Sequence, residues 1–333
     1  MEHLVKYCKE FSIPFRLNFD IKHETYFKRG GIVKVYIQPQ NAKQLEMLVV
    51  FLGGKEVPFK ILGGTTNVFL LDSENYNVII STKNMIELNN HIEYIEVESG
   101  YMLSDLIRVL LINGVQGFEG LEGIPGTIGG AIFMNAGAYG YEVSDHLLEV
   151  KCINSKGEVF VLSKEECKFS FRHSLFKEDS KTFILSAKFD TTKKGNREEI
   201  ANKMEVYHIA RHSYQEFSYP NLGSMFSTRG DMYKEILSKS FEQKAIFWLL
   251  KIILKNPISK FIYRKKPTNN RFNLLVNKYY SVNHPLSHKS INILINTGEV
   301  DDNSIIEHTV KMKELFKSET PIENEIYIEN DLK

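Results

Sequence analysis

Short apolar segments alternate with amphipathic segments along the first two thirds of the chain, separated by Gly, Pro, Asn and Ser. Alternation of apolar and polar positions predicts strands, and apolar positions spaced by three and four predict helices. Strands are predicted over residues 33–39, 59–62, 68–71, 77–81, 94–99, 148–154, 158–162 and 182–190. Helices are predicted after caps at Asn41, Ser104 and Asn196, ending near Gly53, Gly114 and Ser213. The pattern therefore predicts a protein of mixed α and β elements.

The pattern changes after the helix that begins at Asn196, and a second region is predicted there. It opens with a loop that contains Pro220 and Gly223. A strand over 291–296, a helix over 303–317 and a last strand over 322–328 end the chain. We expect a first unit over residues 1–200, made of two subdomains with a boundary near residue 73, and a second unit over residues 201–333.

Composition narrows the classes of partner. Hydrophobic residues make up 43% of the 333 positions and charged residues 25%, as in an ordinary globular protein. The 42 basic and 41 acidic side chains nearly cancel, so no overall field would draw the protein onto nucleic acid. We expect a small-molecule ligand and no nucleic-acid partner, and the sequence leaves the oligomeric state open.

The cysteines and the N-terminus bear on metal binding and compartment. Cys8, Cys152 and Cys167 form no CxxC pair and stand near no histidine cluster of metal-ligand spacing, so we expect reduced thiols and no metal. The N-terminal residues contain no apolar run of signal-peptide length. The longest apolar stretch, 245–254, has about half the length of a membrane span. These features predict a cytoplasmic protein without a membrane span.

The segment 234–266 allows two interpretations. Its nine basic and two acidic residues surround the apolar run AIFWLLKIIL. An apolar helix with cationic flanks is typical of helices that lie on an anionic membrane surface. The same run also fits a buried helix whose lysine stems reach solvent. The buried helix is the favoured interpretation, and it predicts that Trp248 packs in a core.

Glycine clustering is the strongest chemical signal. Nine of the 21 glycines lie between Gly114 and Gly140, and no Lys or Arg occurs between Arg108 and Lys151. Glycine adopts positive φ and lets the main chain approach a ligand, so consecutive backbone N–H groups can hold a phosphate without side-chain cations. The segment LEGIPGTIGGA is a candidate for such a site, and it contains neither a Walker GK[ST] nor a Rossmann GxGxxG.

A second glycine-containing turn, Gly63-Gly64-Thr65-Thr66-Asn67, lies between two predicted strands. Two such turns on one domain could hold the two ends of a dinucleotide. They could equally be tight structural turns, and residue types alone do not separate the two interpretations.

Several motifs resemble those of the UDP-N-acetylenolpyruvoylglucosamine reductases, also called UDP-N-acetylmuramate dehydrogenases. They are GGTTN from Gly63, the long and very specific GFEGLEGIPGTIGGAIFMNAGAYG from Gly117, FRHSLF from Phe171, PNLGSMF from Pro220, NILIN from Asn292 and IENEI from Ile322. The resemblance covers the chain except for about residues 235–285.

The resemblance implies an α+β FAD-binding fold of the vanillyl-alcohol-oxidase (PCMH) type with non-covalent FAD. A smaller α/β substrate-binding domain would follow, with the last strand returning toward the flavin. The positions that it assigns to FAD binding are Gly63, Gly64, Thr65, Thr66, Asn67, Gly123, Ile124, Pro125, Gly126, Thr127, Gly129, Gly130, Asn135, Ala136 and Gly137.

The same resemblance implies a reaction in peptidoglycan precursor synthesis. NADPH would reduce the flavin, and hydride would then pass to the enolpyruvyl double bond of UDP-N-acetylglucosamine enolpyruvate. Three residues match the catalytic positions of the family: Arg172 would stabilise the negative intermediate, Ser224 would donate the proton, and Glu325 would complete the acid and electrostatic site. Glu323 would share the strand face of Glu325, and the motif register favours Glu325.

The chain departs from the family pattern around the substrate. Phe171 stands where Tyr is usual, and Glu216 stands where Pro is usual. Residues 227–229 and 290–293 also differ from the usual residues. Two alternatives follow: a divergent flavin oxidoreductase for another nucleotide-linked sugar, and a flavin-binding protein that has lost turnover. Retention of all three catalytic matches argues against the second alternative.

Overall fold

The computed structural model describes residues 1–226, 286–287, 289–290, 292–315 and 325–327, together with 245, 248, 249 and 252. The helices are α1 (Glu2–Glu10), α2 (Ala42–Gly53), α3 (Leu103–Ile112), α4 (Ile128–Phe133), α5 (Leu175–Glu178), α6 (Arg197–Tyr214) and α11 (Asp302–Leu315). The strands are β1 (Phe15–Asp20), β2 (Ile32–Ile37), β3 (Lys60–Leu62), β4 (Val68–Leu70), β5 (Asn75–Ser81), β6 (Leu88–Asn90), β7 (Tyr94–Glu98), β8 (Gly137–Ala138), β9 (Tyr141–Glu142), β10 (Leu147–Asn154), β11 (Val159–Ser163), β12 (Thr182–Asp190) and β13 (Glu325–Tyr327). Short 3-10 helices are η1 (Ile21–His23), η2 (Thr82–Asn84), η3 (Glu119–Leu121) and η4 (Val143–His146).

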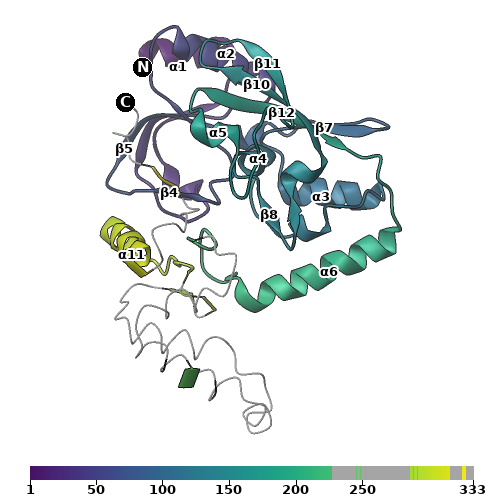
Figure 1. Ribbon diagram of the computed structural model, residues 1–333. Coiled ribbons are helices and arrows are strands. Elements are labelled where there is room, and N and C mark those ends of the chain that lie inside the picture. The colour runs from purple at the N-terminus through teal and green to yellow at the C-terminus, as the bar shows by residue number, and fades with distance from the viewer. Residues whose placement is uncertain are drawn as a thin grey trace.

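Two main sheets organise the N-terminal two thirds of the chain (Figure 1). The first has the order β1-β2-β5-β3, with β1 antiparallel to β2 and with β2 and β3 parallel to β5. The second has the order β11-β10-β12-β7-β6 and is antiparallel throughout. Because β5 lies inside the first sheet, that sheet extends to Ser81, past the boundary that the sequence predicts near residue 73.

Helix α2 fastens the two sheets to each other. It begins after the predicted cap Asn41, whose side chain accepts a hydrogen bond from the Gln44 N–H at 2.9 Å. Its buried residues Leu45 and Leu48 share one apolar cluster with strands of both sheets. Full burial of one such side chain typically stabilises a fold by about 1.5–3 kcal/mol. The interface between the sheets is therefore a continuous apolar core.

A second apolar core lies on the second sheet. In it, helices α3 and α4 pack against β7, β10 and β12. The predicted cap of α3 at Ser104 is wrong, because the helix begins at Leu103 with Met102 at its N-cap. The Leu103 N–H donates to Gly126 O at 3.0 Å, so a tertiary hydrogen bond takes the place of a side-chain cap. This bond ties the glycine-rich segment to the rigid start of α3.

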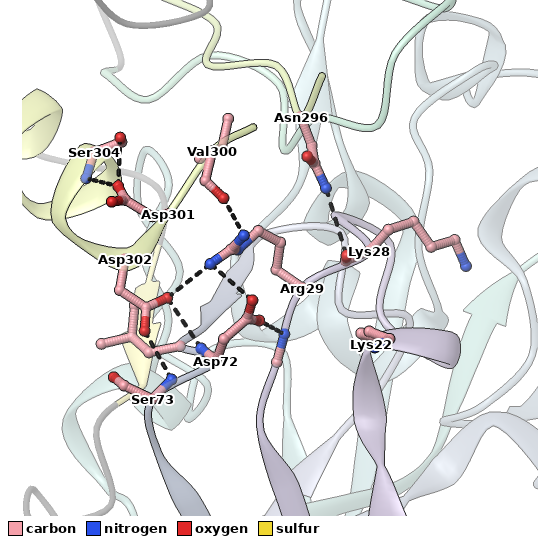
Figure 2. Close-up of polar contacts among 12 residues, drawn as sticks. Lys22, Lys28, Arg29, Asp72, Ser73, Asn296, Val300, Asp301, Asp302 and Ser304 are labelled. Carbon is pink, nitrogen blue, oxygen red and sulfur yellow. Dashed lines mark hydrogen bonds and ion pairs between the residues drawn. The ribbon is translucent and has the colours of Figure 1, made fainter. Parts of the chain in front are cut away.

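The described C-terminal residues are bound to the loops of the first sheet. Strand β13 pairs in parallel with β4, with Glu325 opposite Val68. Figure 2 shows Arg29 between two carboxylates: its Nη2 lies 2.8 Å from Asp72 Oδ2 and 3.2 Å from Asp302 Oδ1. Arg29 also donates to Val300 O. The start of α11 is therefore fixed on the turn between β4 and β5.

The segment 234–266 is described only at Ala245, Trp248, Leu249 and Ile252. Trp248 is 65% exposed, so the prediction that it packs in a core is wrong: its indole ring keeps most of its surface in solvent. Lys251, Lys255 and Lys260 lie outside the described residues. Within the described part of the chain, no helix is long and apolar enough to cross a membrane.

Candidate active site

One cavity of about 1620 Å³ collects residues from segments far apart in the chain. Pockets for single small ligands typically measure about 300–1,000 Å³, so this space is large enough for a dinucleotide together with a second ligand. Its wall includes Arg172 and Ser224, and it also includes every predicted cofactor residue except Asn135: Gly63, Gly64, Thr65, Thr66, Asn67, Gly123, Ile124, Pro125, Gly126, Thr127, Gly129, Gly130, Ala136 and Gly137.

The two glycine-containing loops press against each other in this wall. A Cβ placed on Gly63 would lie 2.3 Å from Thr127 Oγ1, and one on Gly64 would lie 3.0 Å from Gly126 Cα. Gly126 has a φ of +121°, and a Cβ there would lie 2.8 Å from Thr66 Oγ1. Only glycine permits this approach without displacing a neighbour. The loops therefore form one continuous main-chain surface.

Some polar groups of this surface make no hydrogen bond to any described residue. Thr127 Oγ1 and Ser99 Oγ are buried and hydrogen-bond to no described residue. The Thr127 and Gly130 N–H groups likewise donate to no acceptor within the described ranges. Each buried polar group without a partner costs about 1–3 kcal/mol, so a ligand rich in acceptor oxygens fits here.

Arg172 occupies a strained turn. Ser170 and His173 exchange two backbone hydrogen bonds, each of 3.1 Å, and enclose Phe171 and Arg172. Arg172 has a φ of +56°, in a position where such turns usually place glycine. A non-glycine residue there costs about 1–3 kcal/mol and persists where the surroundings hold it. The turn presents the half-buried Arg172 at the cavity wall.

Ser224 lies in a loop whose two sides are fixed by asparagine side chains. Before it, the Gly223 N–H donates to Asn221 Oδ1 at 3.0 Å, and Gly223 has a φ of +72°. After it, Phe226 exchanges two hydrogen bonds with the Asn292 amide, of 2.9 and 2.8 Å. Asn292 is the first of the two asparagines of the NILIN motif, and its hydrogen bonds to Phe226 are a role that the sequence does not reveal. The predicted strand over 291–296 appears as isolated bridges at Leu294 and Ile295.

Glu216, the departure from the family proline, also holds this loop. Its carboxylate accepts the Ser218 N–H at 2.7 Å and the Ser287 hydroxyl at 2.9 Å. Burial by itself would raise the pKa of Glu216, but the hydrogen bonds from Ser218, Ser287 and Phe217 outweigh it, and the pKa is lowered. Glu216 is therefore a carboxylate at neutral pH and joins the end of α6 to residue 287.

Glu325 and Asn135 are the two remaining predicted residues. Glu325 opens β13 opposite Val68, which directly follows the GGTTN loop, so its backbone lies beside the cavity wall. Glu323 lies outside the described residues. Asn135 is only 1% exposed and does not line the cavity, because its amide is used inside the protein by Glu142, Ser170 and Ser144.

Arg211 is a cavity residue that the sequence analysis missed. It lies on α6, is 8% exposed, and donates from Nη2 to Gly120 O at 3.3 Å. Its guanidinium lies over the Tyr139 ring, 5.4 Å from the centroid. Burial, and then the hydrogen bond to Tyr214, raise the pKa of Tyr139, which therefore stays neutral. One sequence signal could have revealed it: the helical spacing places Arg211 on the same face of α6 as the buried residues Ile200 and Met204.

The fold and the cavity define an α+β protein with a large ligand site. Residues 33–163 match the family described as FAD binding domain, which makes this protein a flavoprotein. The described residues contain no group of three or more His, Cys, Asp or Glu side chains that could hold a metal ion.

Curated relatives name the family. The chain is 36% identical over 210 residues to the UDP-N-acetylenolpyruvoylglucosamine reductase of Caldanaerobacter subterraneus subsp. tengcongensis, which covers 63% of this chain and 69% of the relative. It is 34% identical over 216 residues to the enzyme of the same name from Streptococcus pyogenes serotype M3, covering 64% and 72%. The crystal structure of the Thermus caldophilus reductase aligns with a TM-score of 0.65 at 20% identity, over 95% of this chain and 98% of that one. The chain belongs to the UDP-N-acetylenolpyruvoylglucosamine reductase family, which confirms the resemblance and the fold class.

Proposed function

We propose that the protein is an FAD-dependent UDP-N-acetylenolpyruvoylglucosamine reductase of peptidoglycan precursor synthesis, with NADPH as its reductant. One hydride and one proton would add across the enolpyruvyl double bond and give UDP-N-acetylmuramate, while NADPH is oxidised to NADP⁺. The cytoplasm, which supplies both nucleotide substrates, is the compartment that this proposal implies. The observation that carries it is the common cavity, since Arg172, Ser224 and both glycine loops line the same wall.

The glycine loops are proposed to hold FAD. The Thr127 and Gly130 N–H groups and the Thr127 hydroxyl provide donors that have no other described acceptor. FAD, when bound there, supplies the acceptor and the donor of the hydride. Because the two loops pack closely through glycines, their main-chain N–H groups are proposed to provide much of the cofactor contact, together with the Thr127 hydroxyl.

Arg211 is proposed to supply the positive charge that the glycine-rich window lacks. Within the described ranges it has no carboxylate partner, and its Nε has no hydrogen-bond acceptor. A buried cation without a counter-charge is unfavourable, so an anionic group of a ligand is expected beside it. Arg211 lies against Gly120 and Gly123 of the long motif. We therefore assign it to the FAD diphosphate.

Arg172 is proposed to face the substrate carboxylate. When hydride reaches one alkene carbon, negative charge develops on the other carbon and spreads into the carboxylate. A guanidinium can donate to both oxygens of that group at once. Fixed donors of this kind commonly lower the barrier by about 3–4 kcal/mol, because they need no reorganisation when the charge appears.

Ser224 is proposed to deliver the proton to the carbon that carries this charge. A hydroxyl is a weak acid, so the step needs a fixed position and a neighbour that replaces the proton. The bonds from Asn221 and Asn292 to the residues around Ser224 restrict the loop. Glu325 is proposed to act as the acidic group nearby, since its strand pairs with β4 at the cavity wall.

An anaerobic half-reaction experiment tests the function. The purified protein, loaded with FAD, is reduced with one equivalent of NADPH and then mixed with UDP-N-acetylglucosamine enolpyruvate. We expect NADPH to bleach the flavin absorbance and the enolpyruvyl compound to restore it, with UDP-N-acetylmuramate as product. A flavin that is reduced but never reoxidised by this compound would reject the substrate assignment, and reoxidation by another nucleotide sugar would identify the divergent alternative.

A further inference from the structure

The amide of Asn135 reaches from the glycine-rich segment to the turn that carries Arg172. Its Nδ2 donates to Ser170 O at 3.0 Å and to Glu142 Oε2 at 2.8 Å, while its Oδ1 accepts the Ser144 N–H at 3.3 Å. Ser170 is the first residue of this turn. Its backbone hydrogen bonds with His173 close the turn. The hydrogen-bonding capacity of the Asn135 amide is therefore directed into the protein and away from the cavity.

A second tether joins the same two segments. Ser174, which is fully buried, donates from Oγ to Phe133 O at 2.7 Å. Phe133 ends α4, and Asn135 follows it by two residues. The turn is therefore attached on both sides of Arg172 to the short stretch 133–135, which directly follows the glycine-rich loop.

The backbone conformations make this attachment necessary. Arg172 has a φ of +56°, which its own side chain disfavours, so the turn depends on neighbours to keep its shape. Asn135 itself has a φ of +43°, a conformation that asparagine tolerates better than most residues. Asparagine can thus occupy this bend and still present an amide to Ser170.

We propose that Asn135 is a positioning residue, which fixes the Arg172 guanidinium relative to the glycine loops by holding the carbonyl of Ser170. The inference rests on the proposed function, because it takes Arg172 as the cation that faces the substrate carboxylate. It replaces the expectation that Asn135 contacts FAD. Loss of the amide should leave cofactor binding intact and impair the step in which negative charge develops on the substrate.

The test is Asn135→Gly, because glycine keeps the positive φ and removes only the amide. We expect FAD affinity of the apoprotein and flavin reduction by NADPH within about threefold of wild type, while substrate-driven reoxidation slows at least about tenfold. Hydrogen exchange of the peptide 167–176 should rise, while the hairpin β10–β11 stays unchanged. The matched control is Lys168→Gly, which removes an exposed side chain at a φ of +50° near the same turn and should behave as wild type.

A double-mutant cycle with Arg172→Ala decides whether Asn135 acts through Arg172. We expect Asn135→Gly to slow reoxidation by less than about twofold when Arg172 is already absent. If Asn135→Gly slows reoxidation by the same factor with Arg172 present and with Arg172→Ala, or if it lowers FAD affinity, the positioning role is overturned. If Arg172→Ala alone leaves reoxidation unchanged, the proposed role of Arg172 fails, and the inference fails with it.

Ser174→Ala provides a second route if Asn135→Gly does not fold. It removes the other tether of the turn and should give the same split, with normal reduction and slowed reoxidation. Normal reoxidation in Ser174→Ala, together with unchanged hydrogen exchange in peptide 167–176, would show that the turn holds its shape without these tethers and would reject the proposal.

Discussion

Arg29 and Asp302 form a largely buried ion pair of 3.2 Å between segments that lie 273 residues apart (Figure 2). Their side chains are 13% and 15% exposed. The Asp302 carboxylate also accepts the Asp72 and Ser73 N–H groups at 3.0 and 2.8 Å. Asp72 and Ser73 lie in the turn that follows β4, and β4 is the strand that pairs with β13. One carboxylate thus fixes the start of α11 beside the strand that leads from the GGTTN loop.

Asp302→Asn should therefore destabilise the protein at pH 7. The substitution keeps the size of the side chain and removes its negative charge. That charge pairs with the Arg29 guanidinium and accepts the Asp72 and Ser73 N–H groups. Hydrogen bonds to charged groups contribute about 1.5–3 kcal/mol, so we expect a loss of this size in the free energy of unfolding, measured by urea denaturation. Asp105→Asn is the control, because its ion pair with Arg108 is exposed and should contribute less than about 1 kcal/mol.

The pH dependence gives an independent check. Burial alone would raise the pKa of Asp302, but the hydrogen bonds from Ser73 and Asp72 and the Arg29 guanidinium outweigh it, so the pKa lies below its usual value. A carboxyl with a depressed pKa stabilises the fold above its unfolded pKa, about 3.9, and loses this effect as the pH falls through the folded value. The gap between wild type and Asp302→Asn should be constant above about pH 5 and close below about pH 4. A gap that persists in strong acid would reject the ionic origin.

Gly126→Val should abolish FAD retention. Gly126 has a φ of +121°, which a β-branched residue disfavours, and a Cβ there would lie 2.8 Å from Thr66 Oγ1, so the turn and the Thr66 side chain would have to shift. We expect the purified variant to be colourless and to take up no added FAD by fluorescence titration. Gly298→Ala controls for positive φ alone, since Gly298 has a φ of +92° with open space around it, and it should bind FAD normally. Wild-type affinity in Gly126→Val would make the loop contact purely structural.

Local patterns in the sequence predicted much of the fold. The strand over 182–190 and the hairpin of β10 and β11 follow from alternation, and Asn41 and Asn196 cap their helices as predicted. Helix α4 was missed because it has six residues, and two of them, Gly129 and Gly130, are poor helix formers. It persists through tertiary packing of Ile128 and Ile132 in the second core.

The candidate site was predicted less evenly. Motifs revealed the glycine loops, Arg172 and Ser224, because those residues stand in specific local strings. The place of Arg211 in the cavity was not predicted, because its hydrogen bond to Gly120 joins residues 91 positions apart and no local motif indicates that contact. The roles of Asn135 and Asn292 also depend on tertiary contacts, because their side-chain amides hydrogen-bond to backbone groups that are distant in the sequence.

Arg211→Gln should weaken FAD binding. Removal of one charge-assisted contact costs about 1.5–3 kcal/mol, which is about 10- to 150-fold in affinity. We expect the Kd of the apoprotein for FAD to rise within this range and the KM for the UDP-sugar to change little. Arg108→Gln, which removes an exposed arginine, should leave both unchanged. If the KM rises while the Kd for FAD stays constant, Arg211 instead serves the substrate.

Ser224→Ala should separate the two half-reactions. The hydroxyl is proposed to act only when the substrate carbanion takes up its proton, so NADPH should still bleach the flavin, while reoxidation by substrate slows by orders of magnitude. Stopped-flow absorbance measures both steps. Ser218→Ala, an exposed position in the same loop, should leave both rates unchanged. Equal slowing of the two steps would mean that Ser224 maintains the loop and transfers no proton.

Glu325→Gln should behave as Ser224→Ala does, whereas Glu323→Gln should be mild. The two carboxylates stand two residues apart, so a continuous strand would place them on the same face, and composition cannot choose between them. The register of β13 provides the argument, since Glu325 pairs with Val68 directly after the GGTTN loop, and Val68 lines the cavity. A strand held in parallel pairing cannot slip by two residues without breaking its hydrogen bonds to β4. We therefore expect slow reoxidation with normal flavin reduction only in Glu325→Gln. The opposite ranking, with Glu323→Gln as the slow variant, would show that the acidic group approaches the substrate from the residues before β13.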